Sequence, residues 1–366
     1  MAGRIPSPAS SRGTGHDSGS PNAHTATSKH VTKPFRSTLL VVGAGPCGLA
    51  VGTAASSNGV SCVLVDRGPV VHALERFPIG MTWFSTPELL EIGGVPFVTA
   101  GDKPSREEAL KYYRRVATDF DLDIRQYEDV RQIERIDGGS LFEVETRSMS
   151  GETRMYHAQF VVVAIGSFDT PNLLGVEGEQ LEKVNHYFRE PHRYFDQDVL
   201  VIGGSNSAVE SALACWRAGA RVTVVHRGVD FGRGVKLWIL PDMLGRMKAG
   251  EIDVLWDHKV IRIEHDRVLL RSGSGGTETW LPNDFVLAMT GFHPDRDCLA
   301  ALGVTIDPET GVPHHDPETM ETPTPGLFIA GVLAAGKDGN SIFIENGREH
   351  GARIFRCLKH AVVDGV

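Results

Sequence analysis

The fold of this chain is decided by residues 38–57, which read TLLVVGAGPCGLAVGTAASS. Thr38–Val42 is a short β-branched and aliphatic run that predicts a buried strand. The small-residue run Leu49–Ser57 predicts a helix, and Ser61–Val65 predicts a second strand. A strand, a tight turn, a helix and a strand make a βαβ unit, which is the building block of a parallel sheet.

The turn within this unit is a complete GxGxxG motif, in which each glycine has a separate task. Gly43 permits the tight turn, Gly45 lets the backbone approach a pyrophosphate, and Gly48 lets the helix pack closely on the strand. The helix N-terminus offers unpaired N–H groups to the phosphates, and Pro46 removes no donor that the helix needs. Asp66 ends the second strand, where its carboxylate can accept hydrogen bonds from ribose hydroxyls. These residues predict a dinucleotide site.

The same pattern recurs 160 residues further along the chain. Asp198–Ile202 predicts a strand, Ala208–Ala218 a helix and Arg221–Val225 the next strand. The turn between the first strand and the helix reads Gly203-Gly204-Ser205-Asn206-Ser207-Ala208. It matches GxGxxA except that Ser205 replaces the middle glycine, and the Cβ of this serine would push a dinucleotide slightly outward. Two βαβ units so far apart predict an α/β chain with two Rossmann-like dinucleotide-binding domains.

The residues after the last strand of the second unit distinguish the two sites. Arg227 stands there, 24 residues after Gly203, and no carboxylate does. A guanidinium can bind a 2′-phosphate through charge-assisted hydrogen bonds, whereas a carboxylate would repel it. The second site therefore favours NADPH, unless Arg227 is only a solvated charge at the end of a strand. Two dinucleotides in one chain predict hydride transfer from NADPH to FAD at the first site.

Three later apolar runs end at a glycine and fit two such domains. Phe160–Gly166 and Phe285–Gly291 predict buried strands like the connections by which such flavoproteins pass between their domains. Gly326–Gly331 is similar to the strand that closes an FAD site. The final glycines of these runs are candidate cofactor-binding residues: Gly166, Gly291 and Gly331.

These features predict a discontinuous FAD-binding domain with an NADPH-binding domain inserted in it. An N-terminal extension rich in Ser, Thr, Gly and Pro precedes them, and it has too few apolar residues to fold. The expected segments are the disordered extension 1–36, the first part of the FAD-binding domain 37–190, the NAD(P)H-binding domain 191–299 and the second part of the FAD-binding domain 300–366.

Length and composition agree with this division and exclude other classes of protein. At about 150 residues per domain, 366 residues predict two domains. The sequence contains no run of 18 or more apolar residues, which is the length that a membrane-spanning helix needs, so no membrane span is expected. The net charge is −9, of which the extension carries +4, so −13 remains on the rest and argues against nucleic-acid binding. Five scattered cysteines without a CxxC motif fit a reducing cytoplasm better than a disulfide framework.

Several longer motifs are more specific than either glycine loop. They are Gly43–Leu49, Trp83–Ser85, Leu90–Gly93, Trp238–Pro241, Met289–Asp295, Ala330–Gly336 and Ile342–Gly347. With these motifs, residues 37–360 resemble the thioredoxin-reductase-like flavoproteins, and among them the bacillithiol-disulfide reductase family. The resemblance implies that FAD is bound, that NADPH supplies electrons, and that an oxidised low-molecular-weight thiol is reduced, with Cys47 as the redox-active cysteine.

The sequence departs from this resemblance at two places. Thioredoxin reductases carry a CxxC motif just before the second glycine loop, where this chain has Asn185–Arg189, so no dithiol is available there for protein disulfides. The strand that closes the FAD site normally continues Ala-Gly-Asp, whereas Val332 stands in the place of the aspartate here. Asp338 and Glu345 are the candidates to replace that carboxylate.

Cys47 has two interpretations. As a nucleophile, its thiolate attacks the substrate disulfide, releases one thiol and leaves a mixed disulfide. Its place in the first turn of a helix would lower the pKa of the thiol, but the FAD pyrophosphate at the same helix end would oppose a thiolate. As a spacer, Cys47 is a small residue at a position where many flavoproteins have Ala or Ser.

Three functions stay open on the sequence alone. The first is an NADPH-dependent flavoprotein disulfide reductase acting on a small-molecule disulfide. The second is a flavin-dependent monooxygenase, suggested by the segment with His186 and His192, or a ferredoxin-type NADP reductase. The third is a flavin-binding redox sensor with little turnover, for which Ser205 and Val332 give slight support. No spaced cluster of ligands predicts a metal site, and a homo-oligomer is compatible with all three.

Overall fold

The first strand, β1 (Phe35–Val42), begins two residues before the expected start of the ordered chain. The computed structural model describes residues 33–231, 234–339 and 341–363. Phe35, which the sequence assigned to the extension, pairs with Tyr156 in the neighbouring strand, and the two rings stack with 5.4 Å between their centroids. Residues 1–32 of the expected disordered extension lie outside the described residues.

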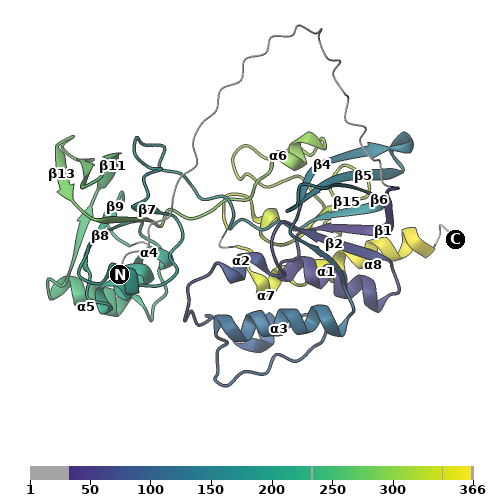
Figure 1. Ribbon diagram of the computed structural model, residues 1–366, viewed down its shortest axis with the longest axis horizontal. Coiled ribbons are helices and arrows are strands. Elements are labelled where there is room, and N and C mark those ends of the chain that lie inside the picture. Colours follow the sequence, from purple (N-terminus) through teal and green to yellow (C-terminus); the bar gives the residue numbers. More distant parts are fainter. Residues whose placement is uncertain (1–32, 232–233, 340, 364–366) are drawn as a thin grey trace, which may run out of the picture. The chain divides into compact units, whose positions relative to one another are not determined.

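A seven-stranded sheet follows the order β3-β2-β1-β6-β5-β4, and β15 also pairs with β6. β1, β2, β3, β6 and β15 run parallel, whereas β4 and β5 are antiparallel additions at one end. Because β15 comes from the C-terminal part of the chain, two separate portions of the sequence build this sheet (Figure 1). Its strands after β1 are β2 (Cys62–Asp66), β3 (Asp123–Gln126), β4 (Glu128–Ile136), β5 (Leu141–Ser148), β6 (Thr153–Val163) and β15 (Leu327–Ile329).

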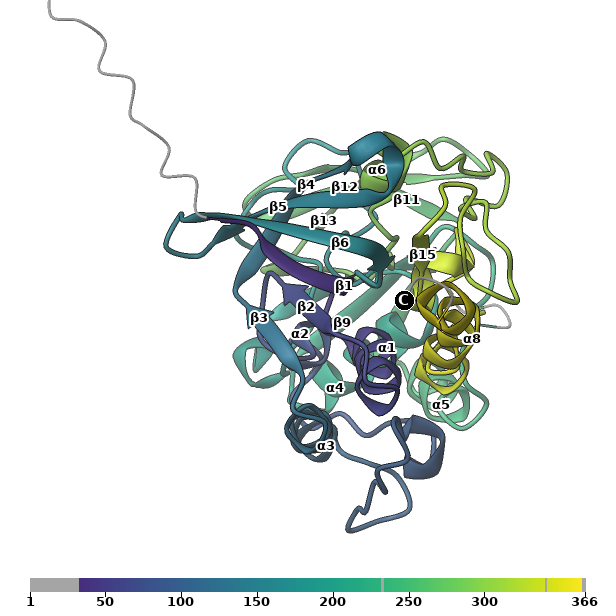
Figure 2. The ribbon, with the colours of Figure 1, turned by 90° about the vertical axis from the view of Figure 1, so that its right-hand side faces the viewer.

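Two helices on this sheet come from distant parts of the chain. α1 (Pro46–Ser57) and α8 (His350–Val363) lie side by side (Figure 2). Their approach is close because Gly351 has no side chain: a Cβ there would lie 2.6 Å from the carbonyl oxygen of Ala50. The other helical segments of this part are α2 (His72–Glu75), α3 (Arg106–Asp119), α7 (Ile344–Gly347) and the 3-10 helices η1 (Pro87–Leu90), η2 (Asp137–Gly139) and η4 (Gly331–Ala335).

A second, five-stranded sheet follows the order β10-β9-β8-β14-β7, and all of its pairs are parallel. None of the helices in the described part of the chain is both long and apolar enough to cross a membrane. The elements of this part are β7 (Val184–Asn185), η3 (His192–Tyr194), β8 (Asp198–Ile202), α4 (Asn206–Arg217), β9 (Arg221–His226), α5 (Leu240–Lys248), β10 (Ile252–Trp256), β14 (Phe285–Ala288) and α6 (Asp297–Ala301).

Both faces of the second sheet are buried. Along β9, Val224 packs into an apolar cluster with residues of α4 and α5, while Val225 packs into a cluster with the three-stranded sheet β11-β12-β13. In β8, Val201 and Leu200 divide in the same way. Successive side chains of a strand point to opposite faces, so a strand covered on both sides is apolar throughout. The three-stranded sheet consists of β11 (His258–Ile263), β12 (Arg267–Ser272) and β13 (Glu278–Pro282).

The expected α/β class is confirmed, with parallel strands at the core of both large sheets, although the first sheet also carries the antiparallel strands β4 and β5. The element bounds differ at the glycine loops. β8 has the predicted bounds. α1 and α4 begin at Pro46 and Asn206, two or three residues before the predicted starts, because loop residues already form the first helical turn. A proline fits that turn, where no N–H is needed. β7 pairs with the second sheet although it precedes residue 191, and the domain boundaries stay predictions.

Gly351 and Gly245 are two helical glycines that test the contact between α1 and α8. Alanine favours a helix over glycine by about 1 kcal/mol, and Gly245→Ala should show this gain because no described atom lies within 4 Å of an added Cβ. Gly351→Ala should instead lower the free energy of unfolding by about 2 kcal/mol, because the methyl group overlaps the Ala50 carbonyl oxygen. Urea unfolding measures both variants. A Gly351→Ala protein as stable as Gly245→Ala would contradict the close contact.

Candidate active site

The first glycine loop, between β1 and α1, has space beside one glycine and none beside the other two. Gly43 has a φ of +106°, and a Cβ there would lie 2.5 Å from the carbonyl oxygen of Ala164. A Cβ on Gly48 would overlap the carbonyl oxygen of Gly43. Beside Gly45, no atom of the described residues lies within 4 Å of an added Cβ. The protein's own packing therefore requires Gly43 and Gly48, whereas the space at Gly45 fits the approach of a phosphate group.

Asp66 fastens this loop from the end of β2. Its Oδ2 accepts a hydrogen bond from the N–H of Ala44 at 2.7 Å, and its Oδ1 accepts one from the N–H of Gly68 at 2.8 Å. Burial raises the pKa of Asp66, and the two N–H donors lower it. Each carboxylate oxygen keeps a second lone pair. The expected bonds from ribose hydroxyls therefore remain compatible with the two bonds that the carboxylate already makes.

The second glycine loop, between β8 and α4, repeats the first. Gly203 has a φ of +144°, and a Cβ there would lie 2.5 Å from the carbonyl oxygen of Met289. The Gly203 N–H donates to the carbonyl of Val225 at 3.0 Å. Ser205, the residue that replaces the middle glycine, is the exposed N-cap of α4, and its side chain makes no capping hydrogen bond. The first N–H groups of α4 are therefore not used by this side chain.

Asn206 and Ser207 form the first turn of α4, and only Ser207 is exposed. The Oδ1 of Asn206 accepts a hydrogen bond from the backbone N–H of Lys236 at 2.9 Å. In the same segment, a Cβ on Gly234 would lie 3.6 Å from the hydroxyl oxygen of Ser205. The segment around Lys236 therefore packs on the second glycine loop, a contact that the sequence did not predict.

Arg227 is exposed directly after β9. Among the described residues, none forms an ion pair with its guanidinium. The preceding His226 covers Gly204, where an added Cβ would overlap the imidazole. Burial, and then the charge of Arg227, lower the pKa of His226, which favours the neutral imidazole. The guanidinium, which has no ion-pair partner within the described ranges, stands where a 2′-phosphate is expected.

The three glycines that follow the later strands have left-handed backbones, which favour glycine over other residues. Their φ angles are +71° at Gly166, +85° at Gly291 and +73° at Gly331. An added Cβ would meet no described atom within 4 Å at Gly166, and the amide nitrogen of Asn172 at 3.3 Å at Gly291. At Gly331 it would meet the sulfur of Cys47 at 3.0 Å. Of these three glycines, only Gly331 therefore lies directly against the Cys47 thiol.

Cys47 lies in the first turn of α1, with its sulfur against two glycines from the C-terminal part of the chain. Besides Gly331, Gly347 leaves space for it, since a Cβ there would lie 2.9 Å from the sulfur. The residue is half-buried, and burial raises the pKa of the Cys47 thiol to about 12. At neutral pH the thiol is protonated, so desolvation outweighs the effect of the helix N-terminus considered from the sequence.

Two further polar groups belong to the part of the fold that contains Cys47. Glu345, one of the two candidates to replace the missing aspartate, accepts a hydrogen bond from the Ser85 hydroxyl. Burial raises the pKa of Tyr113 well above its usual value, and the neighbouring carboxylate of Glu345 raises it further. The indole N–H of Trp83 is buried without a hydrogen-bond partner among the described residues. Since buried donors are almost always satisfied, this N–H indicates room for a bound acceptor.

His350 supports Gly331, although no pattern in the sequence indicates this role. Its Nδ1 accepts a hydrogen bond from the Gly331 N–H at 3.1 Å, and the residue is only 5% exposed. Burial, and then the charges of Arg353 and His315, lower the pKa of His350 to about 4. The neutral imidazole can therefore act as an acceptor at pH 7. A single histidine with no motif around it gave no signal for this role.

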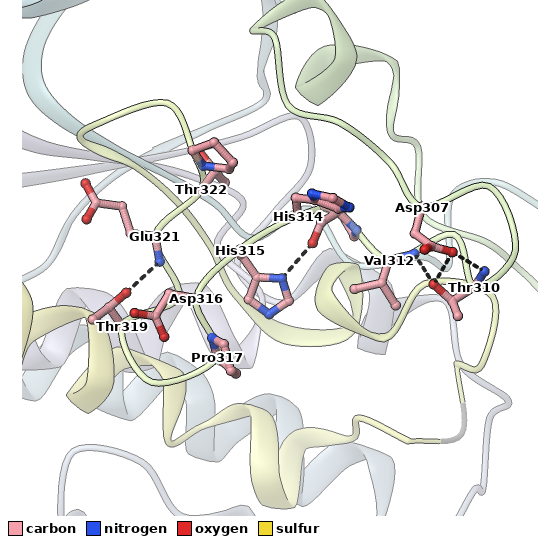
Figure 3. A pocket seen from close by; sticks show the side chains of 12 residues that line it. Asp307, Thr310, Val312, His314, His315, Asp316, Pro317, Thr319, Glu321 and Thr322 are labelled. Carbon is pink, nitrogen blue, oxygen red and sulfur yellow. Dashed lines mark hydrogen bonds between the residues drawn. The ribbon is translucent and has the colours of Figure 1, made fainter.

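A cavity of about 780 Å³ contains none of the candidate residues (Figure 3). It is lined by the segment between residues 307 and 323, where the Nδ1 of His315 lies 2.7 Å from the carbonyl oxygen of Pro313. Within the described ranges, no three His, Cys, Asp or Glu side chains are grouped so that they could hold a metal ion. The candidate site is therefore the pair of glycine loops with Cys47, and not this cavity.

The sequence pattern of the pyridine nucleotide-disulphide oxidoreductase family matches this chain over residues 40–331. The chain belongs to this family. Bacilliredoxin reductase Bdr of Bacillus subtilis (strain 168) is 44% identical over 315 residues, which cover 86% of this chain and 95% of the relative. The structure of bacillithiol disulfide reductase Bdr (YpdA) from Bacillus cereus is 41% identical, with a TM-score of 0.87 over 89% of this chain and 99% of its own.

These relatives confirm the expected resemblance to the bacillithiol-disulfide reductase family. The chain is an oxidoreductase of the pyridine nucleotide-disulphide class. The structure of a thioredoxin reductase from T. acidophilum is 20% identical, with a TM-score of 0.71 over 90% of this chain and 99% of its own. That likeness concerns the fold alone, and it confirms the thioredoxin-reductase-like arrangement of two dinucleotide-binding folds.

The lowered pKa of His350 predicts a pH-dependent stability. Between pH 6.5 and 4 the unfolded chain binds a proton at His350 that the folded chain does not. The free energy of unfolding therefore decreases as the pH is lowered through this range. From pH 7 to pH 4.5 the loss should be about 2 kcal/mol from this residue. His350→Gln keeps an acceptor but cannot be protonated, and should remove that part of the loss. Urea unfolding at both pH values measures it, and equal pH dependence in the two proteins would contradict the assignment.

Proposed function

We propose that this chain is an FAD-dependent reductase that uses NADPH to reduce a low-molecular-weight disulfide, bacillithiol disulfide or a close relative of it, in the cytoplasm. The supporting observation is that two dinucleotide loops occur in one chain and that Cys47 lies within the first of them. The names of the Bacillus relatives support the choice of substrate. The overall reaction converts NADPH, one proton and a disulfide into NADP⁺ and two thiols.

The first loop fits the binding of FAD. The space at Gly45 and the N–H groups of α1 suit its pyrophosphate, and Asp66 suits its ribose. Bound there, the flavin would supply the two-electron link between NADPH and the disulfide.

The second loop fits the binding of NADPH. The N-terminus of α4 lies beside the exposed residues Ser205 and Ser207, whose hydroxyls are suited to phosphate oxygens. The guanidinium of Arg227, which forms no ion pair with any described residue, is suited to the 2′-phosphate that distinguishes NADPH from NADH.

Cys47 is the proposed reacting thiol. Its sulfur attacks one sulfur of the substrate, the substrate S–S bond breaks, and a mixed disulfide with Cys47 forms. Because burial keeps the thiol protonated at pH 7, its proton leaves during the attack and passes to the departing thiolate. Two electrons and two protons then convert the mixed disulfide into the second thiol and the Cys47 thiol.

The other functions considered from the sequence are not favoured. A monooxygenase, a ferredoxin-type NADP reductase and a redox sensor are each less compatible with 44% identity to a bacilliredoxin reductase over nearly the whole relative. Whether the protein forms a homo-oligomer stays a prediction.

Replacing Cys47 separates its two interpretations. Cys47→Ser should keep the reduction of bound flavin by NADPH and lose at least about 100-fold in the rate of disulfide reduction, because serine forms no mixed disulfide. Stopped-flow absorbance measures the first step, and thiol release with bacillithiol disulfide measures the second. Cys62→Ser, which replaces the first residue of β2, is the control and should keep both rates. Undiminished thiol release by Cys47→Ser would make Cys47 a spacer.

Replacing Arg227 tests the choice of nucleotide. Arg227→Ala should raise the KM for NADPH about ten-fold, because a charge-assisted contact with the 2′-phosphate is lost. The KM for NADH, which lacks that phosphate, serves as the internal control and should change little. Flavin reduction at varied concentrations of each nucleotide gives both values. A variant with unaltered preference for NADPH would leave Arg227 as a solvated charge.

A further inference from the structure

Two lysines flank an exposed tryptophan at the edge of the second glycine loop. Trp238 is 60% exposed. The Nζ of Lys103 lies 5.0 Å from the centroid of its ring, and the Nζ of Lys236 lies 5.9 Å from it. Phe84 completes the group: its ring is 5.7 Å from that of Trp238, and the Nζ of Lys236 is 5.4 Å from it. We call these four residues the Lys–Trp cluster.

The two ammonium groups of the cluster, those of Lys103 and Lys236, have no carboxylate partner among the residues that the structure describes. Nearby arginines behave differently, since Arg217 and Arg246 both pair with Asp242. The chain as a whole carries −9, so carboxylates are in excess. An aromatic face attracts a cation but accepts few of its N–H donors, which leaves these donors available to an anion.

A series of contacts links the cluster with the second glycine loop and with the segment that lies against the thiol. On one side, the Asn206 side chain holds the backbone of Lys236 at 2.9 Å. On the other side, Phe84 is followed by Ser85, whose hydroxyl donates to Glu345. Glu345 is two residues from Gly347, which lies against the Cys47 sulfur. A ligand at the cluster would therefore adjoin residues that contact the second glycine loop and, through Ser85 and Glu345, the segment that lies against the Cys47 sulfur.

We propose that the Lys–Trp cluster is an anion subsite that binds a carboxylate of the disulfide substrate. This inference rests on the proposed function and adds the chemical class of the substrate. The carboxylate accepts charge-assisted hydrogen bonds from Lys103 and Lys236, and the exposed face of Trp238 packs on the less polar part of the molecule. Disulfides with carboxylates, such as bacillithiol disulfide with its malate groups, are thereby selected over uncharged ones.

The test compares a charged and an uncharged substrate. The ratio of kcat/KM for bacillithiol disulfide to that for 2-hydroxyethyl disulfide is measured for the wild type, Lys103→Gln, Lys236→Gln and the double variant. Each single change should lower the ratio about three- to ten-fold. Lys248→Gln, which removes an exposed charge from α5, is the matched control and should leave the ratio unchanged. Raising the salt concentration should reduce the ratio in the wild type more than in the double variant.

Two results would overturn the proposal. One is an unchanged ratio in the double variant. The other is an increase confined to the KM for NADPH, which would assign the two lysines to the phosphates of the nucleotide. If the wild type reduces neither disulfide, the proposed function fails, and the subsite is tested by calorimetric binding of bacillithiol disulfide to the oxidised protein. Weaker binding by the double variant would then support the subsite, and equal binding would exclude it.

Discussion

The structure depends on a close backbone contact made twice, once at each glycine loop. Gly43 lies against the carbonyl of Ala164, and Gly203 lies against that of Met289, each at a distance that leaves no space for a side chain. In both cases the contacted carbonyl belongs to the chain just after a parallel strand of the same sheet. This contact brings the N-terminus of a helix to the carboxyl edge of each sheet, where parallel α/β folds bind their ligands.

Residues from the C-terminal part of the chain pack around the Cys47 thiol at the first glycine loop. Gly331 and Gly347 make space for the Cys47 sulfur, Gly351 lets α8 approach α1, and His350 binds the Gly331 N–H. The shift of the Cys47 pKa from 9.0 to about 12 corresponds to about 4 kcal/mol against the thiolate. A helix N-terminus offers about 1 kcal/mol in its favour. Burial therefore decides the protonation state, and the proposed attack must remove the proton as it proceeds.

Local patterns predicted much of the fold and part of the site. The runs before Gly43 and Gly203 predicted both βαβ units, because a buried parallel strand is apolar on both faces and ends at a glycine turn. The start of α1 was less accurate, since Pro46 and Cys47 belong both to the motif and to the helix. His350 and Lys236 gave no signal, because their contacts join residues far apart in sequence. The raised pKa of Cys47 depends on burial, which no motif encodes.

The central claim is that two dinucleotide sites in this chain exchange electrons. Its most direct measurement is an anaerobic titration of the purified protein with NADPH, followed by flavin absorbance. We expect one bound flavin per chain and complete bleaching with about one equivalent of NADPH, because a hydride carries the two electrons that a flavin accepts. A protein that binds no flavin, or whose flavin stays oxidised in excess NADPH, would contradict the account.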